Sequence, residues 1–322
     1  NLDVEGANFS VDLGGVTMAT AAATSTLNIT GDNSLTISGT DTDIRTIDAS
    51  GMVTGGSVVQ TGREATGAST YTGSLGNDTF IMMSPTDVLA GGGGSDTLDI
   101  NYAAILGGLS VDLSSTTDQI VSWNGSAAAG TVTGFENADA TGYTGTFGAL
   151  LVGSTAGNNL LGTANNDQIS GSSGIDTLAG NDGADTIDLG ADTDADNYLV
   201  AAVSDGGALA EDESTNADTV NNFVAGTDDI QIAAAVVAAL GNTAAGGALP
   251  VSTNATNGID KNTNDSDVFV ITNAQNDLDD LSNIIGTIGT TVTSAGDDFF
   301  VVVNNAAGTQ SGLYYVETGA AN

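Results

Sequence analysis

A nine-residue unit recurs in the middle of the chain, and it limits the possible folds more than any other feature. The unit reads G-G-x-G-x-D-x-U-x, where U is a large apolar residue. This pattern fits a tight turn followed by a short strand. Two such units make one coil of about 18 residues, and the strands of successive coils stack on one another. The repeat therefore predicts an all-β solenoid.

The repeat occurs in two arrays within residues 71–200. The first array has two well-formed units, which begin at Gly73 and Gly91, with a degenerate unit between them. Residues 100–152 lack the period but keep strand-like pieces such as Leu109–Leu113. In the second array, glycine holds the first position at Gly153, Gly162, Gly171 and Gly180.

The sixth position of the unit is acidic in nearly every copy. Residues that are one coil apart stack on the same side of a solenoid, so we expect pairs of stacked Asp residues. The pairs are Asp78 with Asp96, Asp167 with Asp185, and Asp176 with Asp194, and Asp87 holds the same position in the degenerate unit. Asn158 holds this position in the first unit of the second array, and we interpret it as a turn residue.

Each position of the unit has a physical role that points to a hard cation. Glycines let the chain turn tightly and bring backbone carbonyl groups to a common point. A cage built only from oxygen suits Ca²⁺, which accepts about 6–8 oxygen ligands, better than Mg²⁺. We therefore predict that the Asp residues above and the fourth-position glycines bind several Ca²⁺ ions. Those glycines are Gly76, Gly94, Gly174 and Gly183.

The alternative is that Asp and Asn only serve as turn residues in a coil that binds no metal. This alternative is strongest for Asp87, whose unit has no glycine in its first four positions. Elsewhere, first-position glycines and eighth-position aliphatic residues coincide with the Asp. Those aliphatic residues in the second array are Leu160, Ile169, Leu178 and Ile187.

The charge of the chain is almost all of one sign. There are 40 acidic residues against 3 basic ones, a formal net charge of −37 at pH 7, and no His or Cys. These counts exclude imidazole catalysts, thiolate nucleophiles, disulfides and Cys or His zinc sites within these residues. We expect no nucleic-acid partner, because phosphate binding needs a basic surface. Metal ions are the obvious counter-charge.

No apolar run approaches the roughly 20 residues of a spanning helix, so we expect no membrane span and a soluble protein. Residues 1–70 alternate apolar residues with Thr, Ser and Asn, as in Leu27–Gly31, Leu35–Gly39 and Ile44–Gly51. This period of two indicates half-buried strands that continue the solenoid.

The character of the sequence changes over residues 201–322. Helices are expected within Ile232–Leu240 and Asn276–Ile288. Strands are expected at Asp267–Thr272, Asp298–Val303 and Leu313–Glu317, the last two as a hairpin. The fold class predicted is thus all-β, a parallel β-solenoid or β-roll, with a small C-terminal α+β cap that covers its open edge.

The two arrays resemble the calcium-binding nonapeptides of the RTX (repeats-in-toxin) family, which build a parallel β-roll. Gly134–Ala138, followed by Gly157–Gly162, is similar to the lead-in of such arrays, and Asp218–Ile230 is similar to the segment that follows them. Ile44–Gly56 resembles strand repeats of large RTX adhesins and bacterial surface-layer proteins. The resemblance implies a secreted, cell-surface protein exported by type I secretion and folded by external Ca²⁺.

Three functions are compatible with these features. The first is a surface-layer or sheath subunit that associates with itself when Ca²⁺ binds. Acidic residues outside the arrays would then bridge subunits or simply form a solvated loop; they include Asp192, Asp196, Glu211, Asp212 and Glu213. The second is an adhesin module that binds a surface or a polysaccharide, for which Trp123, Tyr314 and Tyr315 are candidate contacts, although core packing is the alternative role of these aromatic residues.

The third function is an enzyme that acts on polysaccharides, which we do not expect. Lyase and epimerase sites are rich in Arg, Lys or His, whereas this chain has only Arg45, Arg63 and Lys261, far apart in the sequence. Acidic residues are so common here that paired carboxylates lose their value as a sign of glycoside hydrolysis.

Overall fold

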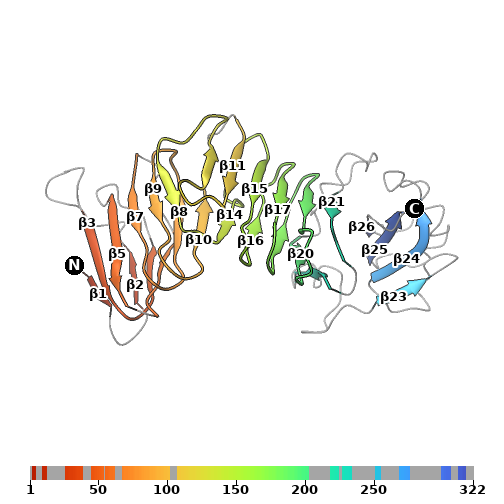
Figure 1. Ribbon diagram of the computed structural model, residues 1–322, viewed down its shortest axis with the longest axis horizontal. Coiled ribbons are helices and arrows are strands. Elements are labelled where there is room, and N and C mark those ends of the chain that lie inside the picture. The colour runs from red at the N-terminus through yellow and green to blue at the C-terminus, as the bar shows by residue number, and fades with distance from the viewer. Residues whose placement is uncertain are drawn as a thin grey trace, which may run out of the picture.

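A computed structural model shows an elongated stack of short strands (Figure 1). It describes residues 2–4, 9–12, 26–38, 45–53, 55–61, 67–101, 107–202, 218–224 and 227–233, and the strands at 251–254, 268–275, 299–305 and 311–316. Within these ranges every regular element is a strand. The predicted all-β class is therefore confirmed.

The strands form three sheets. Sheet A contains β1 (Leu2–Val4), β3 (Thr26–Gly31), β5 (Thr46–Met52), β7 (Thr70–Thr72), β9 (Val88–Ala90) and β13 (Thr131–Thr133). Sheet B contains β2 (Phe9–Asp12), β4 (Leu35–Ser38), β6 (Val58–Gln60), β8 (Thr79–Met82), β10 (Thr97–Ile100), β14 (Asn137–Asp139), β16 (Asn159–Leu161), β18 (Thr177–Ala179), β20 (Asn197–Val200) and β22 (Asp229–Ile232). Sheet C contains β12 (Ile120–Ser122), β11 (Leu109–Asp112), β15 (Ala149–Val152), β17 (Gln168–Ser170), β19 (Thr186–Asp188), β21 (Thr219–Asn221), β26 (Ser311–Val316), β25 (Phe299–Asn305), β24 (Val268–Gln275) and β23 (Val251–Asn254).

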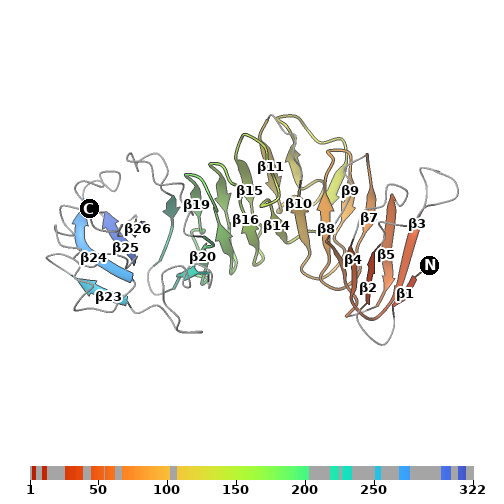
Figure 2. The same ribbon diagram turned by 180° about the vertical axis from the view of Figure 1, so that it is seen from behind.

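Successive strands of the chain alternate between two facing sheets, which is the topology of a parallel β-solenoid. From β1 to β10 they alternate between sheets A and B, and from β14 to β22 between sheets B and C. Sheet B therefore runs through the whole solenoid; seen from behind, β4, β8, β10, β14 and β16 follow one another along the stack (Figure 2). Pairing is parallel except between β11 and β12, β21 and β26, and β25 and β26.

The segment between the two arrays belongs to the solenoid. It supplies β11 and β12, which begin sheet C, and β13 and β14, which extend sheets A and B. Near residue 70 the sheets also continue, because β5 pairs with β7 and β6 with β8. The N-terminal strands, the arrays and the connecting segment thus form one continuous stack.

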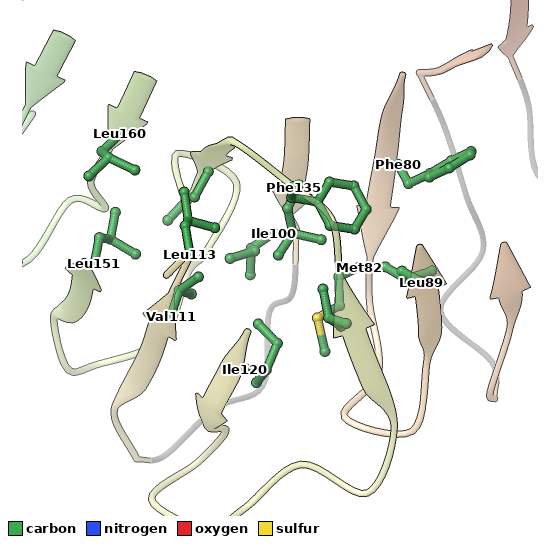
Figure 3. Packing of buried hydrophobic residues seen from close by; sticks show 14 of the residues in the cluster. Phe80, Met82, Leu89, Ile100, Val111, Leu113, Ile120, Phe135, Leu151 and Leu160 are labelled. Carbon is green, nitrogen blue, oxygen red and sulfur yellow. The ribbon is translucent and has the colours of Figure 1, made fainter. Parts of the chain in front are cut away.

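The core is one cluster of buried apolar side chains between the facing sheets (Figure 3). Near the first array, Phe80 contacts Tyr71 and Phe135 with ring centroids 5.5 and 6.5 Å apart. Trp123 is also buried, with 4% of its surface exposed. Core packing is therefore the role that the structure gives to Trp123.

The C-terminal strands extend sheet C beyond β21. The hairpin expected from the sequence is formed by β25 and β26, which pair antiparallel from Phe299 with Val316 to Asn304 with Ser311. β26 meets β21 through Val220 and Ser311, so this region follows the last coil of sheet C. The helices expected at Ile232–Leu240 and Asn276–Ile288 lie outside the described residues, apart from the end of β22.

The part of the chain that the structure describes has no helix with the length and apolar character needed to cross a membrane.

Candidate metal centre

Side chains that are acidic except for Asn158 form a row along sheet B, in the arrays and beside them. We call it the B-edge row; each member lies just before a strand of that sheet. Its members are Asp78, Asp96, Glu136, Asn158, Asp176, Asp196 and Asp228. The backbone N–H of Asp78 donates to Oδ1 of Asp96 at 2.7 Å, and that of Asp96 to Oε2 of Glu136 at 2.8 Å. One side-chain oxygen thus ties each coil to the previous one.

The row continues through the second array in the same way. Asn158 N–H donates to Oδ1 of Asp176 at 2.7 Å, and Asp176 N–H donates to Oδ1 of Asp196 at 2.9 Å. Asp196 N–H then donates to Oδ1 of Asp228 at 3.1 Å. A second row, the C-edge row, precedes the strands of sheet C and consists of Asp167, Asp185 and Asp218.

The stacking predicted for two of the three Asp pairs is found. Asp78 bonds Asp96, and Asp167 N–H bonds Oδ1 of Asp185 at 2.7 Å. The pairing of Asp176 with Asp194 is wrong, because the turn before β20 is two residues longer than the repeat and brings Asp196 into the row. Asp194 is exposed, and its backbone N–H donates to Oδ1 of Asp192 at 2.8 Å.

Sequence analysis missed four members of the rows. Glu136 lies in the lead-in of the second array, and Asp218 and Asp228 lie in the segment that follows it. Their position just before an apolar strand is the signal that could have identified them. Asp196 was assigned to a possible solvated loop, because a fixed period of nine cannot anticipate an insertion. Glu211, Asp212 and Glu213 lie outside the described residues.

Several turns satisfy their sixth-position side chain with their own backbone, and we call them closed turns. In the turn of Asp167, the N–H of Thr163 donates to Oδ2 at 2.6 Å and the Thr163 hydroxyl donates to Oδ1 at 2.9 Å. Ser74 N–H does the same for Asp78 at 2.6 Å. Other closed turns are those of Asp87, Asn158 and Asp228, which accept from Met83, Ser154 and Val224.

Asn158 is therefore a turn residue, as the sequence predicts. Its side-chain oxygen accepts the N–H of Ser154 at 2.6 Å, and its Nδ2 donates to the carbonyl of Glu136 at 2.5 Å. A neutral amide can make both bonds, whereas a carboxylate could only accept.

Three other turns have a different backbone, and we call them open turns. Their second and fourth residues both have positive φ, a conformation that favours glycine or Asn. These residues are Gly92 (111°) and Gly94 (125°) before Asp96, Ser172 (76°) and Gly174 (106°) before Asp176, and Asn181 (68°) and Gly183 (136°) before Asp185. All three open turns have glycine in the fourth position, but so does the closed turn of Asp78, so this glycine alone does not distinguish the two kinds of turn.

Two of the open turns leave a carboxylate oxygen atom without a hydrogen bond. Asp96 and Asp176 are both 0% exposed, and Oδ2 of each has no hydrogen-bond partner in the structure. Each of these atoms lies against the first glycine of its own turn. A Cβ at Gly91 would lie 2.6 Å from Oδ2 of Asp96, and one at Gly171 would overlap Oδ2 of Asp176. A buried carboxylate oxygen without a donor is costly unless a cation binds it.

Backbone carbonyl groups of the neighbouring coil also face these turns. A Cβ at Gly94 would lie 2.6 Å from the carbonyl oxygen of Gly76, so these two predicted site residues lie together. The same relation joins Gly174 to the carbonyl oxygen of Ala156 at 2.9 Å and Gly183 to that of Asn165 at 2.7 Å. The turns thus bring carboxylate and carbonyl oxygen atoms from successive coils close together.

Burial raises the pKa of these carboxyl groups. The pKa of Asp96 and that of Asp176 rise to about 7, chiefly because burial disfavours the charged form, and hydrogen bonds from the backbone oppose the rise. In the C-edge row, burial raises the pKa of Asp167 and of Asp218 to about 6. A nearby cation would lower the pKa of Asp96 and of Asp176 and so keep both groups fully ionised at neutral pH.

The donor set fits Ca²⁺ better than other metals. The oxygen atoms are carboxylates and carbonyls, which hard cations prefer. No group of three or more acidic side chains with the arrangement of a metal site occurs in the described ranges. A cation at an open turn would thus be held by a small number of carboxylates and by backbone carbonyl groups. The groups placed to bind it are Asp96 with the carbonyl oxygen of Gly76 in one turn, and Asp176 with the carbonyl oxygen of Ala156 in another.

Comparison with known families agrees with this chemistry. The model of the RTX calcium-binding nonapeptide repeat matches the chain in four copies, over residues 86–99 and 155–195. No curated protein matches the chain. The fold and turns first define a parallel β-roll with acidic turns, and the family match then identifies these segments as RTX repeats. Repeats of this family bind multiple Ca²⁺ ions, so the predicted cofactor is confirmed.

Proposed function

We propose that this protein is an extracellular structural protein, a subunit of a surface layer or sheath, whose solenoid is folded and assembled by Ca²⁺. The observation that carries the proposal is the pair of fully buried carboxylates, Asp96 and Asp176, each with one oxygen atom that no hydrogen bond satisfies. Bound Ca²⁺ would supply the missing partner. Because the site exists only in the folded chain, the free energy of binding stabilises the fold.

Secretion follows from the same physics. With a net charge of −37 and few basic residues, the chain repels itself when compact and free of metal. Inside a cell, where free Ca²⁺ is scarce, the chain would stay expanded and suited to type I export. Outside the cell, millimolar Ca²⁺ would fold it.

The open and closed turns have separate roles in this proposal. The open turns of Asp96, Asp176 and Asp185 bind Ca²⁺, with carbonyl groups of the neighbouring coil. The closed turns of Asp78, Asp87 and Asp167 are held by their own N–H groups, so they form without metal.

A role in assembly is supported by the same charge. Copies of a chain this acidic repel one another at low ionic strength, and divalent cations between their surfaces remove that repulsion. We propose a structural rather than a catalytic role. The adhesin alternative loses one of its candidate contacts, because Trp123 is buried.

The experiment is size-exclusion chromatography with light scattering, on protein stripped by a chelator and again in millimolar Ca²⁺. We expect a monomer that is expanded over its second array without Ca²⁺, and that becomes compact and then associates when Ca²⁺ is added. Compaction to a stable monomer would contradict the assembly role and favour an adhesin module. An elution volume that Ca²⁺ does not change would contradict both.

A further inference from the structure

The last turn of the second array departs from the repeat. The backbone N–H of Asp176 donates to the side chain of Asp196, 20 residues further on, instead of to that of a residue 18 away. The turn nevertheless begins like an open turn, because Gly190, its second residue, has a φ of 118°. A Cβ at Gly190 would lie 2.5 Å from the carbonyl oxygen of Ser172, the second residue of the preceding turn on this edge. The two additional residues are therefore accommodated after Gly190.

The insertion places a second carboxylate in this turn. Oδ1 of Asp192 accepts the N–H of Asp194, whereas its Oδ2 is buried and has no hydrogen-bond partner. A Cβ at Gly190 would lie 3.3 Å from that Oδ2, on the side of the Ser172 carbonyl. The unsatisfied oxygen atom of Asp192 and the Ser172 carbonyl of the preceding coil thus both lie close to Gly190.

The turn of Asp176, in the preceding coil, supplies further oxygen atoms. Asp176 is fully buried, with its own Oδ2 unsatisfied. A Cβ at Gly171 would overlap this atom and lie 3.0 Å from the carbonyl oxygen of Leu189. Burial is the main cause of the raised pKa of Asp176, and the charges of Asp196, Asp192 and Asp194 raise this pKa further, so all three carboxylates lie near it.

We propose that Asp176, Asp192 and the carbonyl groups of Ser172 and Leu189 form a Ca²⁺ site at the end of the second array, with Asp192 as a ligand that the nonapeptide pattern does not specify. This inference rests on the proposed function, namely that open turns bind Ca²⁺. Two unsatisfied carboxylate oxygens face this site, and a larger ligand charge raises the affinity for Ca²⁺. The site therefore binds Ca²⁺ more tightly than the turn of Asp96. Asp194, which the period of nine selects, is exposed and is not a ligand.

The test is isothermal titration of the full chain with CaCl₂, comparing wild type with Asp192→Asn and Asp194→Asn. Asp192→Asn removes the charge but keeps an oxygen that accepts the N–H of Asp194. We expect it to weaken the tightest class of sites by at least about tenfold. Asp194→Asn, the matched control, should change that affinity by less than about twofold. Circular dichroism in saturating Ca²⁺ checks that each variant is folded.

The outcomes separate this inference from the proposed function. If wild type binds Ca²⁺ and the two variants lose equal affinity for it, or Asp194→Asn loses more, the role of Asp192 is overturned. The proposed function then stays intact. Absence of any Ca²⁺ binding by wild type would overturn both. If Asp192→Asn does not fold, Asp192→Ser, which also keeps an acceptor for Asp194, provides the same comparison.

Discussion

The N-terminal coils and the second array belong to one stack but differ in what stabilises them. The N-terminal coils, up to the first array, bury large side chains such as Phe80, whose ring contacts those of Tyr71 and Phe135. In the second array, β16, β17 and β19 instead each bury a single aliphatic residue in the eighth repeat position: Leu160, Ile169 and Ile187. Less apolar area is buried per residue there, so the turns must contribute more of the stability.

Within the second array, two consecutive turns differ in how their Asp side chain is satisfied, and so in what they need to be stable. Thr163 satisfies both oxygen atoms of Asp167, whereas Oδ2 of Asp176 has no partner. The two Asp residues occupy the same repeat position, so a sequence pattern does not distinguish them. The difference lies in the backbone, because Ser172 and Gly174 have positive φ.

Removing Ca²⁺ should have the largest effect of these changes, and it should destabilise the second array more than the N-terminal coils. We expect amide hydrogen exchange to accelerate most in β18 and β20, beside the open turns, and least in β4 and β6. Each site occupied at 100 times its Kd contributes about 2.7 kcal/mol to the stability of the fold. Hydrogen exchange with mass spectrometry, with and without a chelator, measures the difference. Uniform acceleration over the whole stack would show that the two regions share one source of stability.

Removing one carboxylate should distinguish an open turn from a closed one. Asp176→Asn is expected to weaken Ca²⁺ binding by at least about tenfold, because a ligand charge is lost. Asp167→Asn should lower stability by about 1 kcal/mol through a lost acceptor and leave the Ca²⁺ affinity unchanged. Calcium titrations and urea unfolding of both variants measure these quantities. An equal loss of affinity in the two variants would remove the distinction between the turns.

Acidification should act oppositely on the metal-free and the Ca²⁺-bound chain. Burial raises the pKa of Asp96 and of Asp176 to about 7 in the fold, so the fold favours their protonated forms. The stability that this preference gives is fully present below the pKa of the unfolded chain, about 4, and is lost as the pH rises through about 7. The metal-free chain should therefore unfold at a higher temperature at about pH 5 than at about pH 8.

Ca²⁺ needs the ionised carboxylates, so its stabilising effect should grow over the same pH interval. Thermal unfolding followed by circular dichroism at several pH values, with and without Ca²⁺, tests both trends. A metal-free chain that becomes more stable as the pH rises would contradict the burial of these groups.

The smallest expected effect concerns the backbone of an open turn. Ser172 has a φ of 76°, which costs a residue other than glycine about 1 kcal/mol. Ser172→Gly should therefore stabilise the Ca²⁺-bound chain by about that amount. Ser154, which holds the same position in a closed turn and is not among the residues with positive φ, is the matched control. Ser154→Gly should destabilise, and a gain in both variants would refute the backbone difference.

Much of the fold could be predicted from the repeat. The alternation of apolar and polar residues located strands such as β4, the eighth position of the repeat located strands such as β17, and the spacing of Asp78 and Asp96 predicted their stacking. The insertion before β20 could not be predicted in the same way, because the repeat supplies a register only while its length is constant. Asp194 was selected by counting nine residues, whereas the chain closes its coil on Asp196.

What the sequence by itself determined is the short-range chemistry: the nine-residue period, the glycines that permit tight turns, and an excess of carboxylates that calls for Ca²⁺. Only the tertiary structure decided which carboxylates are left unsatisfied. Whether Asp167 or Asp176 keeps a free oxygen depends on whether a backbone N–H of its own turn points at it, and that direction is set by φ and by the neighbouring coil. The tertiary structure likewise decided that Asp192 lies near Asp176, which belongs to the preceding coil.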